Sequence, residues 1–91
     1  MILIWRIEFQ RNAVKQLGKL TKSDANRIVS FLTDRVAQDD NPRRAGAALQ
    51  GSELGNFWRY RVGDYRIICD IQDQKLVVLV VEIGHRREIY R

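Results

Sequence analysis

The sequence predicts a two-layer α+β domain in which a helix hairpin covers one face of an antiparallel sheet. Two patterns lead to this fold class. Apolar residues recur at helical spacing from residue 9 to residue 36, and three short segments between residues 57 and 83 have the apolar pattern of strands. The chain has 91 residues, so a single domain over residues 1–91 with one modest core is expected.

The N-terminal part contains one strand and two helices. Residues 2–7 are expected to form the strand, Phe9 to begin the first helix, and Ser23 to cap the second helix. Only a few residues separate the two helices, so they should form an antiparallel hairpin. The apolar helical positions are Phe9, Ala13, Val14, Leu17 and Leu20 in the first helix, and Ala25, Ile28, Val29, Leu32 and Val36 in the second.

The C-terminal part begins with an irregular segment and continues as a three-strand meander. In the stretch DDNPRRAGAALQG, Asn41 and Pro42 are expected to cap and begin at most one short helical turn. Tight turns are expected at Gly63-Asp64 and near Asp73-Gln74. The three strands are expected at about residues 57–62, 65–71 and 75–83.

The helix hairpin should return the chain to the end of the sheet from which it left. The first strand is therefore expected to run opposite to the first and third strands of the meander. If the first strand pairs with the apolar strand Leu76–Ile83, that strand is covered on both sides, which suits its sequence LVVLVV.

Charge and composition favour an anionic partner. The 16 Lys/Arg against 11 Asp/Glu give a net charge of +5, which favours nucleic acid, an acidic protein or a lipid surface. The single cysteine, Cys69, cannot form an internal disulfide, and a lone His85 with scattered carboxylates gives no metal-ligand spacing. Arg6 interrupts the N-terminal apolar run too early for a signal peptide or a membrane span. A cytoplasmic protein without metal, cofactor or membrane partner is expected.

The segment FWRYRVGDYRIICDI assigns its residues to two faces of the sheet. With a two-residue turn at Gly63-Asp64, Val62 lies opposite Tyr65 and Arg61 lies opposite Arg66. The face expected under the helices carries Trp58, Tyr60, Val62, Tyr65, Ile67, Cys69 and Ile71. The other face carries Phe57, Arg59, Arg61, Arg66, Ile68 and Asp70.

Arg61 and Arg66 are thus expected to be cross-strand neighbours, with Arg59 two residues along. Like charges placed this way cost on the order of 0.2–1 kcal/mol. One interpretation is a solvated face, with the arginines splayed apart or paired to Asp70. The other is an anion site, in which a bound phosphate bridges several guanidinium groups and offsets the cost.

The closing octapeptide GHRREIYR leaves the end of the last strand. His85, Arg86 or Arg87, and Tyr90 are expected to fold over the face that carries the arginines. Together these residues outline a phosphodiester site, in which arginines stabilise charge that grows on the phosphate. Tyr90 is either a residue that stacks on a base or moves a proton, or a frayed terminal aromatic residue.

The sequence resembles the RelE/ParE superfamily, the small toxins of bacterial and archaeal type II toxin–antitoxin modules. The resemblance covers nearly the whole chain and rests on the element order, on NP…LQG before the sheet, on WRYRVGDYRIICDI in the hairpin and on VVEIGHRREIY at the end. The combination of RYRVGDYRI with GHRREIY is specific. The chain is more similar to the RelE branch, whose members cleave messenger RNA in the ribosomal A site.

The resemblance implies a role for particular residues. Arg59 and Arg61 match the basic pair on the first hairpin strand, Arg66 the phosphate-stabilising arginine, Arg86 the arginine near the leaving group, and Tyr90 the terminal tyrosine. Arg61, Arg66, Arg86 and Tyr90 are therefore the expected catalytic residues, and Arg59, His85 and Arg87 the expected RNA-binding residues. The implied reaction is attack by a 2′-hydroxyl on its adjacent phosphate.

Some members of the family have lysines in the first basic pair. A lysine whose pKa is lowered can act as the base. Arginine cannot do this, because its pKa exceeds about 12. The base here is expected to be Tyr90, His85, Glu53 or a group supplied by the ribosome. Without a histidine pair, turnover on free RNA should be poor, and the ribosome should supply the geometry.

Two other functions are compatible with the same fold. The first is inhibition of DNA gyrase without catalysis, as the resemblance to ParE implies. The second is an inactive or purely regulatory relative. In each case the family implies a cognate antitoxin, acidic in its binding segment, that wraps the helices and the sheet edge.

Overall fold

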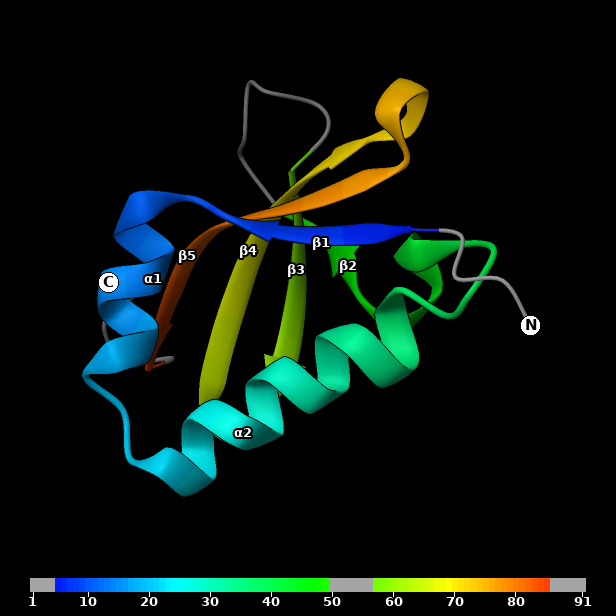
Figure 1. The fold of residues 1–91 in the computed structure, drawn as a ribbon. Helices are drawn as coiled ribbons and strands as arrows, with labels where there is room; N and C mark the ends of the chain where they lie inside the picture. The colour runs from blue at the N-terminus through cyan, green and yellow to red at the C-terminus, as the bar shows by residue number, and fades with distance from the viewer. Residues whose placement is uncertain (1–4, 50–56, 86–91) are drawn as a thin grey trace.

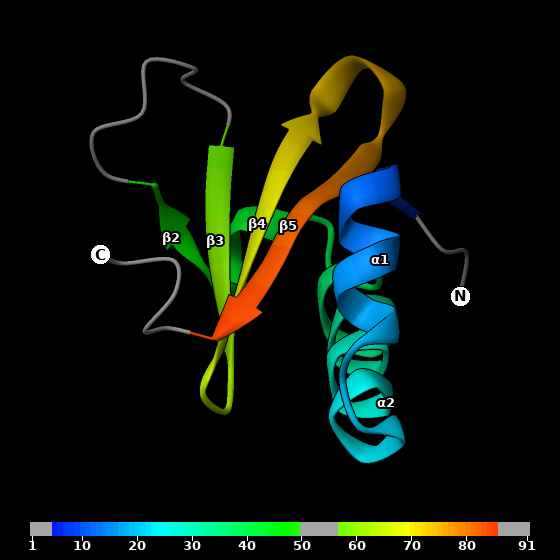
Figure 2. The same ribbon diagram turned by 90° about the vertical axis from the view of Figure 1, so that its left-hand side faces the viewer.

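The structure is a computed structural model, and it describes residues 5–49 and 57–85. Within these residues the chain forms a sheet with two α-helices on one side of it, which Figures 1 and 2 show from two directions. The strands are β1 (Arg6–Phe9), β2 (Ala47–Ala48), β3 (Phe57–Val62), β4 (Tyr65–Gln72) and β5 (Val77–His85), and the helices are α1 (Arg11–Gly18) and α2 (Lys22–Ser30). The predicted two-layer α+β class is confirmed.

The order of the strands in the sheet is β1-β5-β4-β3-β2. The predicted pairing of the first strand with β5 is confirmed, but the predicted direction is wrong, because β1 runs parallel to β5. The cause is β2, a two-residue strand at the sheet edge that the sequence did not reveal. The first strand after the helices does run antiparallel to β1, as expected, but this strand is β2. Because β3 is antiparallel to β2, β3 runs in the same direction as β1. The sheet is therefore mixed.

The β3–β4 hairpin has the predicted register. Val62 pairs with Tyr65, and Arg61 pairs with Arg66. The two-residue loop begins with Gly63, whose φ of 58° is a conformation that glycine adopts without steric cost. Alternation from this point assigns the side chains of both strands to the two faces of the sheet.

The second helix starts two residues earlier than predicted. Its cap is Thr21, not Ser23, and the Thr21 hydroxyl oxygen accepts a hydrogen bond from the Asp24 backbone N–H at 3.1 Å. The helix then continues as a π-helical segment, η1 (Phe31–Val36), which brings Leu32 and Val36 into the core. No helix among residues 5–49 and 57–85 has the length and the apolar character needed to cross a membrane.

The core lies between the helices and the inner face of the sheet. The inner-face residues predicted from β3 and β4 are either buried or packed against the core, which confirms the assignment of faces. The fully buried residues include Ala13, Ile28, Leu32, Val36, Ile67, Cys69, Ile71, Val78 and Val80. Since β3 and β4 bury one face here, their other face is fixed in position as well.

The predicted short turn is present as a 3-10 helix, η2 (Pro42–Ala45), and the Asn41 side-chain oxygen caps it by accepting a hydrogen bond from the Arg43 backbone N–H at 3.1 Å. Directly after it, Gly46 presses against β3. A Cβ atom at position 46 would lie 2.4 Å from the Arg59 carbonyl oxygen and 2.8 Å from ring carbons of both Trp58 and Tyr60. The sequence therefore needs a glycine here for close approach of two backbones.

We expect Gly46→Ala to lower the free energy of unfolding by about 1–3 kcal/mol, because the added methyl group must displace the turn from β3. Gly18→Ala is the matched control. Gly18 lies in α1, and an added Cβ atom there would meet nothing within 4 Å. It should raise stability by up to about 1 kcal/mol. Urea unfolding of the three proteins measures both effects, and equal stability of Gly46→Ala and the parent would contradict the close approach.

Candidate functional site

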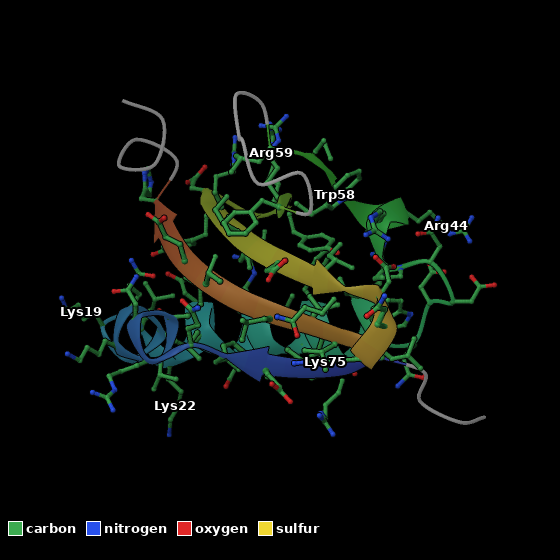
Figure 3. The ribbon with its side chains drawn as sticks, turned by 90° about the horizontal axis from the view of Figure 1, so that it is seen from above. Lys19, Lys22, Arg44, Trp58, Arg59 and Lys75 are labelled. Carbon is green, nitrogen blue, oxygen red and sulfur yellow. The ribbon has the colours of Figure 1, made fainter. Side chains whose placement is uncertain are left out.

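Three arginines of the β3–β4 hairpin lie on the outer face of the sheet, which is the face turned away from α1 and α2. Arg61 is the direct cross-strand neighbour of Arg66, and Arg59 lies opposite Ile68, as predicted. Figure 3 shows Arg59 on the side of the sheet opposite the helices. Because side chains alternate between the two faces, two arginines of β3 and one of β4 lie side by side on the same face.

The three arginines line one hollow of ≈ 260 Å³, which we call the outer pocket. The hairpin supplies one wall, and the turn η2 with β2 supplies the other. The residues of this second wall other than Arg44 are small, namely Ala45, Gly46 and Ala47. Ala47 lies directly opposite Arg59 in the β2–β3 pairing. The pocket is lined by Arg44, Ala45, Gly46, Ala47, Arg59, Tyr60, Arg61 and Arg66.

The arginines of the outer pocket differ in exposure. Arg61 is exposed, Arg59 is half-buried, and Arg66 is only 5% exposed. The Nε and Nη1 atoms of Arg66 are shielded from solvent. Gly84, which pairs with Arg66 on β5, adds no side chain beside it. A guanidinium held in this way is a fixed positive charge, and its planar fork of donors matches the oxygens of a phosphate group.

The fourth arginine of the pocket, Arg44, was not predicted from the sequence. It lies in η2, and its guanidinium contacts the carboxylates of Asp39 at 3.0 Å and Asp40 at 3.2 Å. The hydrogen bond to Asp39 raises the pKa of Arg44 above its usual value, so this side chain remains charged. The backbone N–H of Asn41, followed by Arg44, holds the pKa of Asp39 below its ordinary value. Arg44 therefore adds a positive charge at the edge of the outer pocket.

The turn that carries Arg44 is held against the sheet by two aromatic side chains of β3. The buried Tyr60 hydroxyl donates to the Pro42 carbonyl oxygen at 2.6 Å, and the Trp58 indole N–H donates to the Arg43 carbonyl oxygen at 3.0 Å. Burial raises the pKa of Tyr60, which keeps its hydroxyl protonated and able to donate. The Tyr60 ring also packs in the core, where Phe31 contacts it edge-on with 5.8 Å between the ring centroids.

A third contact ties the same turn to the far end of the hairpin strands. Arg43 donates to both carboxylate oxygens of Asp73, at 2.9 and 2.8 Å, and its guanidinium carbon lies 5.8 Å from the centre of a Trp58 ring. Asp73 begins the turn η3 (Asp73–Lys75) between β4 and β5. The position of η2 is therefore set by several contacts, and the place of Arg44 at the outer pocket follows from them.

The prediction that His85 lies beside Arg59, Arg61 and Arg66 is wrong. His85 pairs with Tyr65 on the helix-facing side of the sheet, and their ring centroids are 5.9 Å apart. It lines a separate hollow of ≈ 460 Å³ with residues that include Gln16 and Lys19 of the helix layer.

A β-bulge causes this difference. Ile68 pairs with Glu82 whereas Cys69 pairs with Val80, so β5 has one extra residue at this point. An extra residue reverses which side chains of the following segment face inward. Without the bulge, His85 would lie on the outer face with the arginines. With it, His85 lies on the inner face beside Tyr65.

The other predicted site residues lie outside the described residues. They are Arg86, Arg87 and Tyr90, together with Glu53, a candidate base. Within residues 5–49 and 57–85, no three His, Cys, Asp or Glu side chains gather closely enough to hold a metal ion. The described part of the site is thus a pocket lined by arginines of η2, β3 and β4.

Comparison with known proteins gives the chain a family. Residues 7–90 match the family described as the ParE toxin of the type II toxin–antitoxin system parDE. The chain is also 29% identical over 87 residues to Toxin RelG of Mycobacterium tuberculosis, in an alignment that covers 96% of this chain and 97% of RelG.

Solved structures of toxin–antitoxin complexes have the same fold. The RelBE2 complex of Mycobacterium tuberculosis matches with a TM-score of 0.80 and 26% identity, over 94% of this chain and 95% of the matched chain. The archaeal RelE–RelB complex of Pyrococcus horikoshii matches with a TM-score of 0.72 and 26% identity, over 91% and 96%. The family match, the relative and the fold agree with the resemblance found in the sequence: the chain belongs to the ParE toxin family of type II toxin–antitoxin systems, within the wider group of RelE/ParE-type toxins.

Proposed function

We propose that this toxin is an endoribonuclease that cleaves messenger RNA in the ribosomal A site. The observation that carries the proposal is the outer pocket, which is lined by four arginines. Like charges are not placed on adjacent strands for stability, since each such pair is unfavourable. A bound phosphodiester offsets this repulsion, because each guanidinium gains a charge-assisted hydrogen bond.

The proposed reaction needs no metal or cofactor. The 2′-oxygen of a nucleotide attacks its adjacent phosphorus, and the bond from phosphorus to the 5′-oxygen of the next nucleotide breaks. A base takes the proton of the 2′-hydroxyl, and an acid protonates the departing 5′-oxygen. The products are a 2′,3′-cyclic phosphate and a 5′-hydroxyl. Arg61 and Arg66 stabilise the charge that grows on the phosphate oxygens, and Arg59 holds the RNA backbone.

The base and the acid must be groups other than the arginines, which stay protonated. Tyr90, Glu53 and the ribosome are the proposed sources of the base, and Arg86 is proposed to act near the leaving group. Arg87 is proposed as a further RNA contact. His85 is left out of this set, because it faces the helix layer beside Tyr65. A ribosome that holds the codon in line for attack supplies the orientation that these few groups do not.

We expect cleavage of a translated messenger and little cleavage of the same RNA without ribosomes. On ribosomes, Arg61→Ala should lower the single-turnover rate by about 10²–10³-fold, because one stabilising charge is lost at the transition state. Mapping of the 5′ ends of the products measures both the rate and the cleavage site.

The matched control is Arg6→Ala, since Arg6 is also an exposed strand arginine but lies on β1 and pairs with Glu8. Its cleavage rate should equal that of the parent. Equal cutting of free and translated RNA would contradict ribosome dependence, and unchanged cutting by Arg61→Ala would contradict catalysis at the outer pocket.

A second candidate function is inhibition of DNA gyrase without catalysis. The match to the ParE toxin family over residues 7–90 favours it. If the chain acts in this way, it should stop supercoiling by purified gyrase while translation in a cell-free system continues. We expect the opposite result, with translation arrested and supercoiling intact. Arrest of supercoiling alone would replace the nuclease proposal with this one.

We also propose that a cognate antitoxin with an acidic binding segment neutralises this toxin. The net charge of +5 and the toxin–antitoxin complexes with the same fold support this partner. Added to the ribosome assay, the antitoxin should abolish cleavage, and its affinity should fall as salt screens the charges. Affinity that does not change with salt would show that charge complementarity is not the basis of binding.

A further inference from the structure

Arg44 is a member of the outer pocket to which the sequence gives no role. It comes from a different part of the chain than Arg59, Arg61 and Arg66, and it lines the same hollow. Figure 3 shows it at the end of the molecule where η2 packs against the sheet. The contacts from Tyr60 and Trp58 to η2 fix the backbone that carries it.

The two neighbouring arginines of η2 have different surroundings. Arg43 is 30% exposed in its side chain and makes two hydrogen bonds to one carboxylate, that of Asp73. Arg44 is 64% exposed and divides its guanidinium between Asp39 and Asp40, with Nη2 to Asp40 at 3.2 Å. Arg43 thus connects η2 to η3, whereas Arg44 is an exposed cation at the edge of the outer pocket, paired with the carboxylates of Asp39 and Asp40.

Exposed ion pairs of the Arg44 kind are weak, because water screens both charges and two long side chains must be ordered. A phosphate group inside a pocket already lined by three other guanidinium groups is a stronger partner, since it is less screened and accepts two hydrogen bonds from one fork. Arg44 can therefore leave the two carboxylates and bind a phosphate in the outer pocket at a small cost in free energy.

We propose that Arg44 is a fourth contact to the RNA backbone, and that Asp39 and Asp40 act as its counter-ions until RNA displaces them. The inference rests on the proposed function of the outer pocket as an RNA site. A contact to phosphate carries no base information, so Arg44 contributes to affinity for single-stranded RNA of any sequence. The acidic pair in turn lowers that affinity, because RNA must compete with it.

The salt dependence of binding tests the contact. The probe is a short single-stranded RNA with a 2′-deoxy substitution at the cleavable position, titrated between 50 and 200 mM salt. Each phosphate contact on a single strand adds about 0.7 to the slope of log K against log salt. Arg44→Ala should reduce the slope by about that amount, whereas Arg44→Lys, which keeps the charge, should leave it unchanged. Arg6→Ala, which removes another exposed and ion-paired arginine, should also leave the slope unchanged.

Removal of one counter-ion tests the exchange. Asp40→Asn should tighten RNA binding about two- to five-fold, the range expected from an exposed ion pair. The gain should disappear in the Arg44→Ala background. Glu8→Gln is the control, since it removes the carboxylate partner of Arg6 on β1 and lowers the negative charge equally. A gain that persists without Arg44, or that Glu8→Gln reproduces, would overturn the exchange.

The variants of β3 separate this inference from the function on which it rests. If Arg59→Ala lowers the slope while Arg44→Ala does not, the Arg44 contact is wrong and the RNA site remains. If Arg59→Ala and Arg61→Ala also leave the slope unchanged, or the parent binds no RNA at 50 mM salt, the outer pocket is not an RNA site and both proposals fail. Circular dichroism of each variant confirms that it is folded.

Discussion

The register between β3 and β4 is the constraint on which both the core and the outer pocket depend. Because side chains alternate between faces, the pairing that buries Tyr60 and Ile67 also places Arg61 opposite Arg66. A slip of one residue would turn the arginines into the core and the apolar residues into water. The hydrophobic effect on one face thus holds together like charges that repel each other on the other face.

The parts of the fold that were predicted are those specified by local patterns. Alternation and a two-residue loop with glycine were enough to give the whole β3–β4 pairing and the inner and outer faces. The Asn41 cap and the Pro42 start of η2 were also read correctly, because both depend on neighbouring residues only. These features need no information about distant contacts.

The errors about β1, His85 and Arg44 have tertiary causes. Two alanines carry no strand signal, yet β2 reverses the direction expected of β1 relative to β5. A single extra residue in β5 moves His85 to the other face, and the run VVLVVEIG shows no period that would reveal it. Arg44 reaches the pocket because Tyr60 and Trp58 hold η2 in place. Its only local signal is the pair of arginines after Pro42.

The Tyr60 side chain connects the helix layer to the outer pocket. Its ring meets Phe31 of the helix layer, and its hydroxyl holds the turn on which Arg44 stands. A shift of Phe31 would therefore move η2, which forms one wall of the outer pocket, through the ring of Tyr60. The shape of the outer pocket is thus coupled to side-chain packing in the helix layer.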